Sequence, residues 1–338
     1  VTGVAFPDWA EEDDCLKLCG RLLEVLKGLP SLQSALFLSM GDLGAVDKEV
    51  LRERHLISNE LAEKGYDSGV VISRDEQTAI MINEEDHLRL QVICPGLDLP
   101  VLWERISTLD NEIDSRVSYA FRPDLGYLTA CPTNVGTGLR ASVMMHLAGL
   151  KFTEEIESVI KGLERLGLAV RGIEGEGTEA AGNMFQISNQ TTLGETEEQI
   201  IDRLARIVHE VIAHEMNARE RLMESRRKYV IDHIGRCIGV LMHAVLMSSK
   251  EAMDLLSGVR VGVELGLVKN LTVSRINETM LLTQPGHLQK VEGTGMKSEE
   301  RDEVRARIVR ESISGVKLVG MGRGRSARRC RQQVKKSL

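Results

Sequence analysis

The 338-residue chain has few prolines, few cysteines and no long apolar run, and each shortage excludes a class of protein. Only seven prolines stand beside 42% hydrophobic residues, which excludes a disordered or collagen-like chain and predicts a soluble globular protein. No stretch reaches the roughly 20 uninterrupted apolar residues of a membrane helix, so we expect no membrane span. The six cysteines are scattered without CxxC pairs, which indicates a reducing compartment, and we interpret the protein as cytoplasmic.

Several nucleotide and metal motifs are absent as well. There is no GxxxxGK[ST] loop, no GxGxxG after a strand and no HRD or DFG set, which argues against a P-loop ATPase, a Rossmann enzyme and an ordinary protein kinase. The segment HEVIAHE resembles a zinc-protease motif, but its spacing is wrong. His209 and His214 are five residues apart, so their rings would point roughly 140° apart on a helix. We therefore predict no protein-bound metal.

The charge is distributed unevenly. The net charge is −7, and since the tail from Lys317 onward contributes eight basic residues and no acid, residues 1–316 carry −15. The tail has no aromatic residue that could stack on a base, so we interpret it as a solvated terminus and do not expect nucleic acid as a partner.

Hydrophobic periodicity predicts mixed helices and strands up to about residue 218 and helices alone beyond it. We place a domain boundary there, with domains at 1–218 and 219–338. The helices expected in the first domain cover 11–28, 47–56, 101–117, 138–150, a segment capped by Thr153 and one that begins with a capping box of Thr196 and Gln199. The expected strands cover 69–73, 78–82, 87–93, 126–130, 168–173 and 184–189.

Two segments carry candidate chemistry. If the strand over 87–93 already begins at Glu85, that carboxylate shares a polar face with Arg89, about 13 Å away at roughly 3.3 Å per residue. The loop CPTNVGTG lies between a predicted strand and a predicted helix with Arg140 in its first turn, which predicts an anion site. Cys131 at this point is either a reactive thiolate or a buried, inert cysteine.

The loop CPTNVGT closely resembles the guanidino kinase signature CP[ST]N[IL]GT and departs from it only at Val135. The elements NEEDHLR at 83–89, RGIEGE at 171–176 and GNMFQISN follow in the family's order. With RHLIS at 54–58, TQPGHLQ and the helical C-terminal extension, the chain resembles the bacterial protein arginine kinases (McsB type) of the ATP:guanido phosphotransferase (phosphagen kinase) family. The resemblance implies an α+β fold, with an antiparallel sheet flanked by helices and then a smaller all-α domain.

The resemblance also implies ATP-dependent phosphorylation of arginine side chains in proteins, with Mg²⁺ held mainly by phosphate and water oxygens. By match to the family, Glu85 and Glu176 grip the guanidino group, one of them as the base, and Cys131 approaches a guanidino nitrogen as thiolate. The implied ATP site comprises His55, the phosphate-binding Arg89, Arg140 and Arg171, and the segments Arg140, Ala141, Ser142, Val143, Met144 and Arg171, Gly172, Ile173, Glu174, Gly175, Glu176.

A second implied site lies in the C-terminal domain. Arg301, Asp302, Glu303, Val304, Arg305 and Ala306 match the RDxxRA motif that forms an allosteric phosphoarginine pocket in protein arginine kinases. The alternative is a solvated helix with charges at i, i+4 spacing. The family's SSRxRxARN stretch, which binds phosphate, would precede Val1, so we expect two further phosphate-binding arginines to be missing from the N-terminal segment.

The implied setting is the bacterial stress response and the marking of proteins for Clp-type proteolysis. Its implied partners are protein substrates with exposed arginines, a zinc-finger activator protein, a Clp ATPase and a second copy in a homodimer. Two alternatives stay open: a phosphagen kinase that acts on a free guanidino compound, and an inactive adaptor that binds phosphoarginine.

Overall fold

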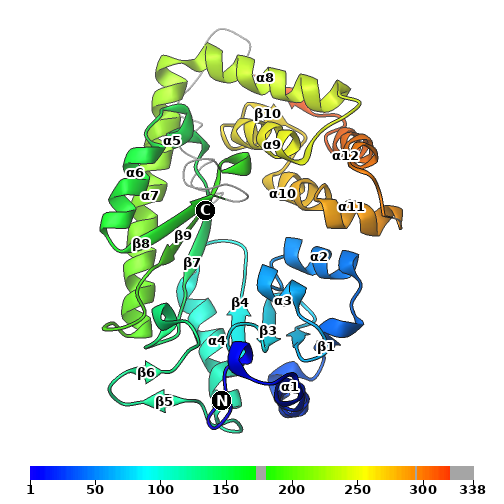
Figure 1. Cartoon of the computed structure of the whole chain (residues 1–338). Coiled ribbons are helices and arrows are strands. Elements are labelled where there is room, and N and C mark those ends of the chain that lie inside the picture. The colour runs from blue at the N-terminus through cyan, green and yellow to red at the C-terminus, as the bar shows by residue number, and fades with distance from the viewer. Residues whose placement is uncertain (173–179, 294, 320–338) are drawn as a thin grey trace. The chain divides into compact units, whose positions relative to one another are not determined.

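The computed structural model describes residues 1–172, 180–293 and 295–319. These residues form two compact units (Figure 1). Unit 1 comprises residues 1–141 and 190–202, and unit 2 comprises 142–189 and the residues from 203 onward. Each unit has its own antiparallel sheet and its own covering helices.

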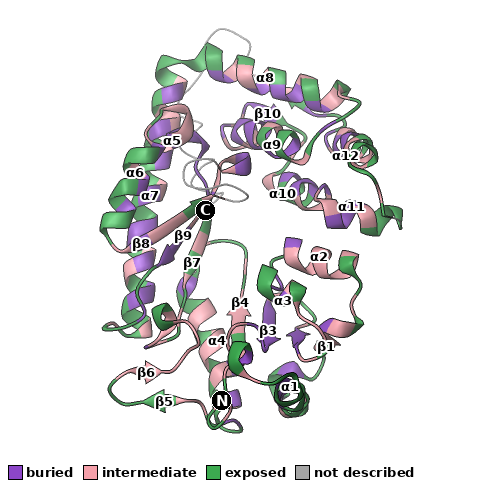
Figure 2. Ribbon diagram, in the orientation of Figure 1, coloured by how far each residue is buried: buried purple, intermediate pink, exposed green. Residues whose placement is uncertain are grey.

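The sheet of unit 1 has the strand order β1-β2-β3-β4, and all neighbours are antiparallel. Its strands are β1 (Leu36–Ser39), β2 (Gly69–Ile72), β3 (Thr78–Ile82) and β4 (Leu88–Val92). The two central strands are buried on both faces, as Figure 2 shows for β3, because alternate side chains enter two different cores.

Four helices cover the two faces of this sheet. Val71 and Ile80 pack with α1 (Glu12–Lys27) and α4 (Leu99–Asp114). Val70 and Met81 face the core that includes Leu61 of α3 (Asn59–Glu63) and Leu51 of α2 (Ala45–Glu53). Unit 1 also contains the hairpin of β5 (Phe121–Arg122) and β6 (Gly126–Tyr127), and the short 3₁₀ turns η1 (Pro7–Trp9), η2 (Pro30–Leu32), η3 (Met40–Asp42) and η4 (Pro132–Asn134).

The sheet of unit 2 has the order β7-β9-β8, so the last strand in sequence lies in the middle. The strands are β7 (Ser142–His146), β8 (Leu168–Gly172) and β9 (Met184–Asn189), which follows the turn η5 (Ala181–Asn183). The helices next to it are α5 (Ala148–Phe152), α6 (Ile156–Arg165) and α7 (Glu197–Ser225), of which residues 197–202 belong to unit 1.

The C-terminal part of unit 2 is helical. It contains α8 (Arg227–His243), α9 (Ser249–Glu264), α10 (Val273–Leu282), α11 (Pro285–Glu292) and α12 (Ser298–Ser312), with a two-residue ladder between β10 (Val268–Lys269) and β11 (Lys317–Leu318). One hydrophobic core joins α8, α9, α10 and α12 and extends to Ala148 of α5 and Ala181 of η5. No helix among the described residues combines the length and the hydropathy required to cross a membrane.

Most of the expected elements are confirmed. The hairpin of β2 and β3, the strands β4, β8 and β9 and the helices α1, α2 and α4 lie where the periodicity predicted them. The capping box at the start of α7 is also present. The Thr196 N–H donates to Gln199 Oε1 at 2.9 Å, and the Gln199 N–H donates to Thr196 Oγ1 at 3.3 Å.

Three local predictions were wrong. Residues 138–150 are not one helix, because Ser142–His146 pairs with β9 along its whole length and only Ala148–Phe152 is helical. Thr153 does not cap the next helix. It ends α5, and α6 begins after Glu155. The strand expected over 126–130 is only two residues long.

Candidate active site

Glu85 lies in a tight turn, so the strand over 88–92 does not begin at Glu85. Asn83 has a φ of 54°, and its N–H donates to His87 O at 3.1 Å, so the chain reverses before β4 begins at Leu88. The left-handed residue ends the extended conformation, so the condition under which Glu85 and Arg89 would share one strand face is not met.

The turn instead brings Glu84 to Arg89. Glu84 is only 3% exposed, and its Oε1 lies 2.6 Å from Arg89 Nη1. The Glu84 carboxylate also accepts the N–H of Glu85 at 3.2 Å. Sequence reasoning missed Glu84, because its pairing with Arg89 depends on the turn and not on strand alternation.

Cys131 and Glu85 lie together in unit 1. The backbone N–H of Ala130 donates to Asp86 Oδ1 at 2.7 Å, which ties the loop to the turn and places Cys131 beside Glu85. Burial raises the pKa of the Glu85 carboxyl, the charges of Asp86 and Glu84 add to this, and the neighbouring Cys131 side chain opposes it. The net pKa of Glu85 is raised, so this carboxylate is a better proton acceptor than an exposed one.

The loop around Cys131 has a defined shape. Cys131 Sγ lies 2.9 Å from Thr133 Oγ1, and the Thr137 N–H donates to Thr192 O at 2.9 Å. Gly136 has a φ of +116°, and a Cβ there would lie 2.2 Å from Thr192 O, so only glycine fits. The chain continues into β7, so no helix N-terminus follows the loop, and the predicted anion site lacks that part of its basis.

His55 and Arg89 are both associated with the polar face of β4. His55 O accepts a hydrogen bond from Gln91 Nε2 at 2.5 Å, and Gln91 alternates with Arg89 along the strand. Burial, followed by the charge of Arg52, lowers the pKa of His55. The His87 ring instead contacts the N-terminal segment, where its Nε2 lies 2.8 Å from Ala5 O.

Five further residues of the implied ATP site lie on the sheet of unit 2: Ser142, Val143 and Met144 on β7, and Arg171 and Gly172 on β8. Met144 of β7 pairs with Gln186 of β9, which pairs in turn with Arg171 of β8, so the three residues form one row across the sheet. Gln186 Nε2 donates to Ser142 Oγ at 3.0 Å. Arg140 and Ala141 precede β7 and belong to unit 1, with Arg140 exposed. Val143 lies on β7 and Gly172 ends β8, whereas Ile173, Glu174, Gly175 and Glu176 lie outside the described residues.

The RDxxRA match lies on α12, and its two arginines differ. Arg305 is 2% exposed. Its Nε donates to Thr283 O at 2.9 Å, its Nη1 donates to Met247 O at 2.8 Å, and it is paired with Asp302. Arg301 is partly exposed and donates from Nη1 to Met296 O at 2.8 Å.

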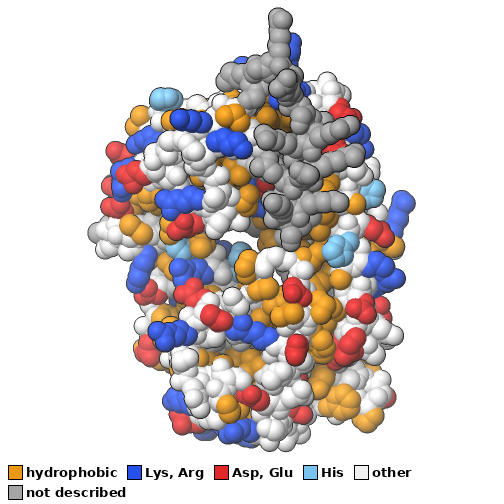
Figure 3. Space-filling model, turned by 180° about the vertical axis from the view of Figure 1, so that it is seen from behind, with side chains coloured by type: hydrophobic (Ala, Val, Ile, Leu, Met, Phe, Trp, Pro, Cys, Tyr) orange, Lys and Arg blue, Asp and Glu red, His pale blue; other side chains and the backbone are white. Residues whose placement is uncertain are grey.

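Acidic and basic side chains are intermixed on the face of the described residues drawn in Figure 3. Within residues 1–172, 180–293 and 295–319, no group of three or more His, Cys, Asp or Glu side chains could hold a metal ion.

Sequence comparison defines the class. A family model described as "ATP:guanido phosphotransferase, C-terminal catalytic domain" matches residues 21–218. A second model, described as "Protein-arginine kinase McsB C-terminal domain", matches residues 227–322. The chain belongs to the ATP:guanido phosphotransferase family.

Curated relatives place the chain more narrowly. It is 50% identical over 276 residues to the protein-arginine kinase of Halalkalibacterium halodurans, an alignment that covers 82% of this chain and 78% of that protein. It is 42% identical over 311 residues to the protein-arginine kinase of Halothermothrix orenii, which covers 92% and 89%. Within its family the chain groups with the protein-arginine kinases.

Solved structures agree with the fold. The crystal structure of lombricine kinase matches with a TM-score of 0.56 and 26% identity, over 64% of this chain and 63% of that chain. The duplicated taurocyamine kinase from Schistosoma mansoni with bound transition-state analogue components matches with a TM-score of 0.58 and 27% identity, over 64% and 31%. The expected guanidino kinase fold is therefore confirmed, with a helical C-terminal part after it.

Proposed function

We propose that the chain transfers the γ-phosphoryl group of ATP to the guanidino group of arginine side chains in proteins. The observation that carries this proposal is the corner in which the Ala130 N–H, next to Cys131, donates to the Asp86 carboxylate, next to Glu85, at 2.7 Å. A guanidinium has a pKa above roughly 12, so it must lose a proton as its nitrogen attacks phosphorus. A carboxylate with a raised pKa beside a thiol supports this step.

Each residue of the corner has a proposed role. Glu85 orients the guanidinium and takes its proton, and Cys131 approaches one of its nitrogens. Arg89 neutralises phosphate oxygens, and Glu84 fixes the direction of its side chain. Glu176, which lies outside the described residues, supplies the second carboxylate by its match to RGIEGE.

The proposed nucleotide site uses His55, Arg140 and the row of Met144 and Arg171. Arginines suit this task because they contact phosphate oxygens bidentately. The remaining positions of the site are Ala141, Ser142, Val143, Gly172, Ile173, Glu174 and Gly175. ATP enters as its Mg²⁺ complex, in which phosphate and water oxygens hold most of the coordination sphere.

We also propose that α12 carries a phosphoarginine pocket. Arg301 is partly exposed, and Asp302 follows it in the sequence. The Arg301 guanidinium would bind the phosphoryl group of phosphoarginine, and the Asp302 carboxylate would bind its guanidino group. Arg305 is buried, and its hydrogen bonds to two backbone carbonyls fix α12 to the neighbouring segments. Glu303 and Val304 continue the motif, and Ala306 is fully buried in the core.

The cellular setting follows from the family and is part of the proposal. It comprises a cytoplasmic stress response, marking of substrates for Clp-type proteolysis, a zinc-finger activator protein and a homodimer. The match of residues 227–322 to the McsB C-terminal domain favours this role over that of a phosphagen kinase for a free guanidino compound.

The test is a comparison of substrates. With Mg·ATP, we expect ADP release to rise with a denatured, arginine-containing protein and not with free arginine at the same concentration of guanidino groups. The same protein with its arginines chemically blocked is the control. Release with free arginine alone would support the phosphagen kinase, and no release with either substrate would support the adaptor.

A further inference from the structure

Met144, Gln186 and Arg171 form the row of the unit 2 sheet that the proposed nucleotide site uses. The next row on the same face of the sheet contacts the C-terminal helices. Alternation along β7 places Met144 and His146 on the same face of the sheet. Met144 stands in the row of Gln186 and Arg171, and His146 stands one row further, opposite Met184 of β9. A helix that covers His146 therefore covers the end of the face on which the proposed nucleotide residues lie.

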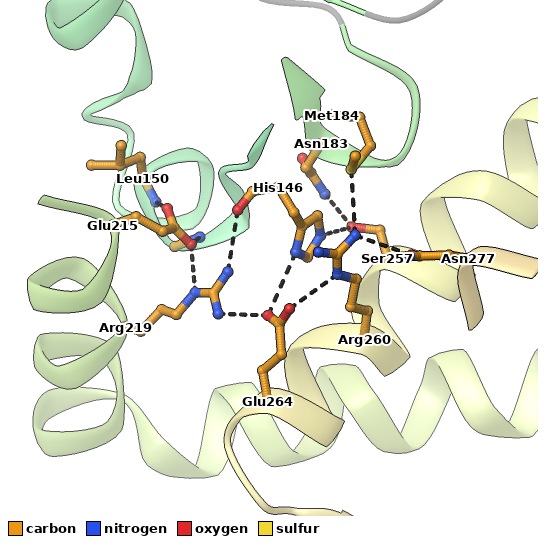
Figure 4. A network of polar contacts seen from close by, with 11 residues as sticks. His146, Leu150, Asn183, Met184, Glu215, Arg219, Ser257, Arg260, Glu264 and Asn277 are labelled. Carbon is orange, nitrogen blue, oxygen red and sulfur yellow. Dashed lines mark hydrogen bonds and ion pairs between the residues drawn. The ribbon is translucent and has the colours of Figure 1, made fainter. Parts of the chain in front are cut away.

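Helix α9 covers this end. Met144 is 39% exposed, whereas His146 is 7% exposed and Ser257 of α9 is fully buried. His146 Nε2 lies 2.8 Å from Ser257 Oγ, and Arg260 Nη1 lies 3.6 Å from Met184 Sδ (Figure 4). Two positions of α9 thus contact both members of the row that follows Met144.

Ser257 also holds the start of β9. Asn183 Nδ2 donates to Ser257 Oγ at 2.8 Å, and the Gly182 N–H donates to Asp254 Oδ1 at 3.0 Å. Because Asn183 donates to the serine oxygen, the serine hydroxyl proton remains to be donated to His146 Nε2. One hydroxyl on α9 therefore links the end of β7 to the turn before β9.

The protonation state of His146 agrees with a hydrogen bond in which the Ser257 hydroxyl donates to His146 Nε2. Burial lowers the pKa of His146 and outweighs the neighbouring Glu264 carboxylate, so the ring is neutral. We assign its proton to Nδ1, which lies 3.6 Å from Glu264 Oε2. Arg219 and Arg260 both pair with Glu264, and Arg219 also donates to His146 O at 3.2 Å.

We propose that Ser257 is a positioning residue for the nucleotide, through which α9 of the C-terminal helical part fixes β7 and the row of Met144 and Arg171. The inference rests on the proposed function, because it assumes that this row binds ATP. It makes α9 a support of the nucleotide site, so the loss of the Ser257 hydroxyl lowers nucleotide affinity although Ser257 does not contact the nucleotide.

The experiment measures binding of Mg·ADP by isothermal titration calorimetry, which needs no phosphoryl transfer. We expect Ser257→Ala to raise the Kd for Mg·ADP about fivefold or more. The matched control is Ser248→Ala, which removes the N-cap of the same helix, where Ser248 Oγ accepts the Glu251 N–H at 3.2 Å. This control should lower the melting temperature and leave the Kd within twofold of the wild type.

A second pair of variants tests the path through the imidazole. His146→Phe should raise the Kd about as much as Ser257→Ala, and the double variant should raise it no further, since both remove the same link. Independent, multiplied effects would contradict the link. An unchanged Kd in Ser257→Ala, or an equal rise in Ser248→Ala, would overturn the inference alone. A wild-type chain that binds no Mg·ADP would overturn the proposed nucleotide site and the inference with it.

Discussion

Glu85 and Cys131 are near each other because two backbone features, the left-handed Asn83 and the bond from Ala130 N–H to Asp86, shape their segments. The proposed chemistry therefore depends on a turn and a loop, and neither residue's role follows from a helix or a strand. The motifs NEEDHLR and CPTNVGT indicate which residues are candidates for the chemistry. They do not predict the turn and the loop that bring Glu85 and Cys131 together. Glu84, which no motif reasoning had singled out, is the buried partner of Arg89.

Removal of the carboxylate should abolish transfer. Glu85→Gln and Glu176→Gln should each lower kcat by roughly 10²-fold or more, because an amide cannot accept the proton and misorients the guanidinium. Kd for Mg·ATP should stay within about threefold, since these side chains act on the guanidinium. Cys131→Ala should be milder. A variant of either glutamate that retains a tenth of the activity would contradict its assigned role.

The glycine of the loop should be irreplaceable. Gly136→Ala forces a side chain to a φ of +116° and brings its Cβ to 2.2 Å from Thr192 O, so we expect a loss of at least roughly 1–3 kcal/mol in the free energy of unfolding. Gly20→Ala is the control, because Gly20 lies in α1 and a Cβ added there would have no neighbouring atom within 4 Å. Urea denaturation measures the free energy of unfolding of both variants. A Gly136→Ala variant as stable as the Gly20→Ala variant would show that the loop adapts to the side chain.

At the scale of elements, β7 shows where sequence reasoning ends. Ala141, Met144 and Met145 are residues with good helix propensity, so the segment favours a helix locally. Its partner β9 lies about forty residues away in the sequence and supplies the pairing that makes it a strand. The strands β2 and β3 could be predicted because each one's partner is its neighbour in the chain. Long-range pairing cannot be inferred from local pattern, and the helix predicted after the CPTNVGTG loop was wrong for that reason.

Helix α12 leads to a prediction that separates its two arginines. Arg301→Ala should abolish stimulation by added phosphoarginine and leave the free energy of unfolding within about 0.5 kcal/mol of the wild type. Arg305→Ala should destabilise unit 2, since the carbonyls of Met247 and Thr283 lose their donor at roughly 1–3 kcal/mol each. Phosphoarginine titration and urea denaturation measure the two effects. Stimulation that survives Arg301→Ala would refute the pocket.

At the scale of the whole molecule, a buried polar network in unit 2 joins the region of the catalytic-domain match to the helical C-terminal part. It connects His146 with Arg219, Arg260 and Glu264. Burial lowers the pKa of His146. Burial alone would raise the pKa of Glu264, but His146, Arg219 and Arg260 outweigh it and hold it well below its usual range. The expected domain boundary near residue 218 falls inside the continuous helix α7, and Arg219 of that helix is a member of the network.

The network predicts a pH dependence of stability. Below the ordinary histidine pKa of 6.5, the unfolded chain binds a proton that folded His146 does not, so the free energy of unfolding falls as the pH drops. Glu264 has the same sign: its contribution is complete above its ordinary pKa of 4.5 and is lost as the pH falls through the lower, folded value. His146→Gln should therefore reduce the slope between pH 7 and 5 in urea denaturation. His209→Gln, on the exposed side of α7, should keep the wild-type slope.

The central proposal is phosphoryl transfer to protein arginines at the corner of Glu85 and Cys131. The most direct test is mass spectrometry of a denatured protein incubated with this chain and Mg·ATP, worked up without acid so that N–P bonds survive. We expect phosphate on arginine residues with the wild type and none with Glu85→Gln. Phosphate on serine, threonine or tyrosine instead, or equal phosphoarginine with Glu85→Gln, would contradict it.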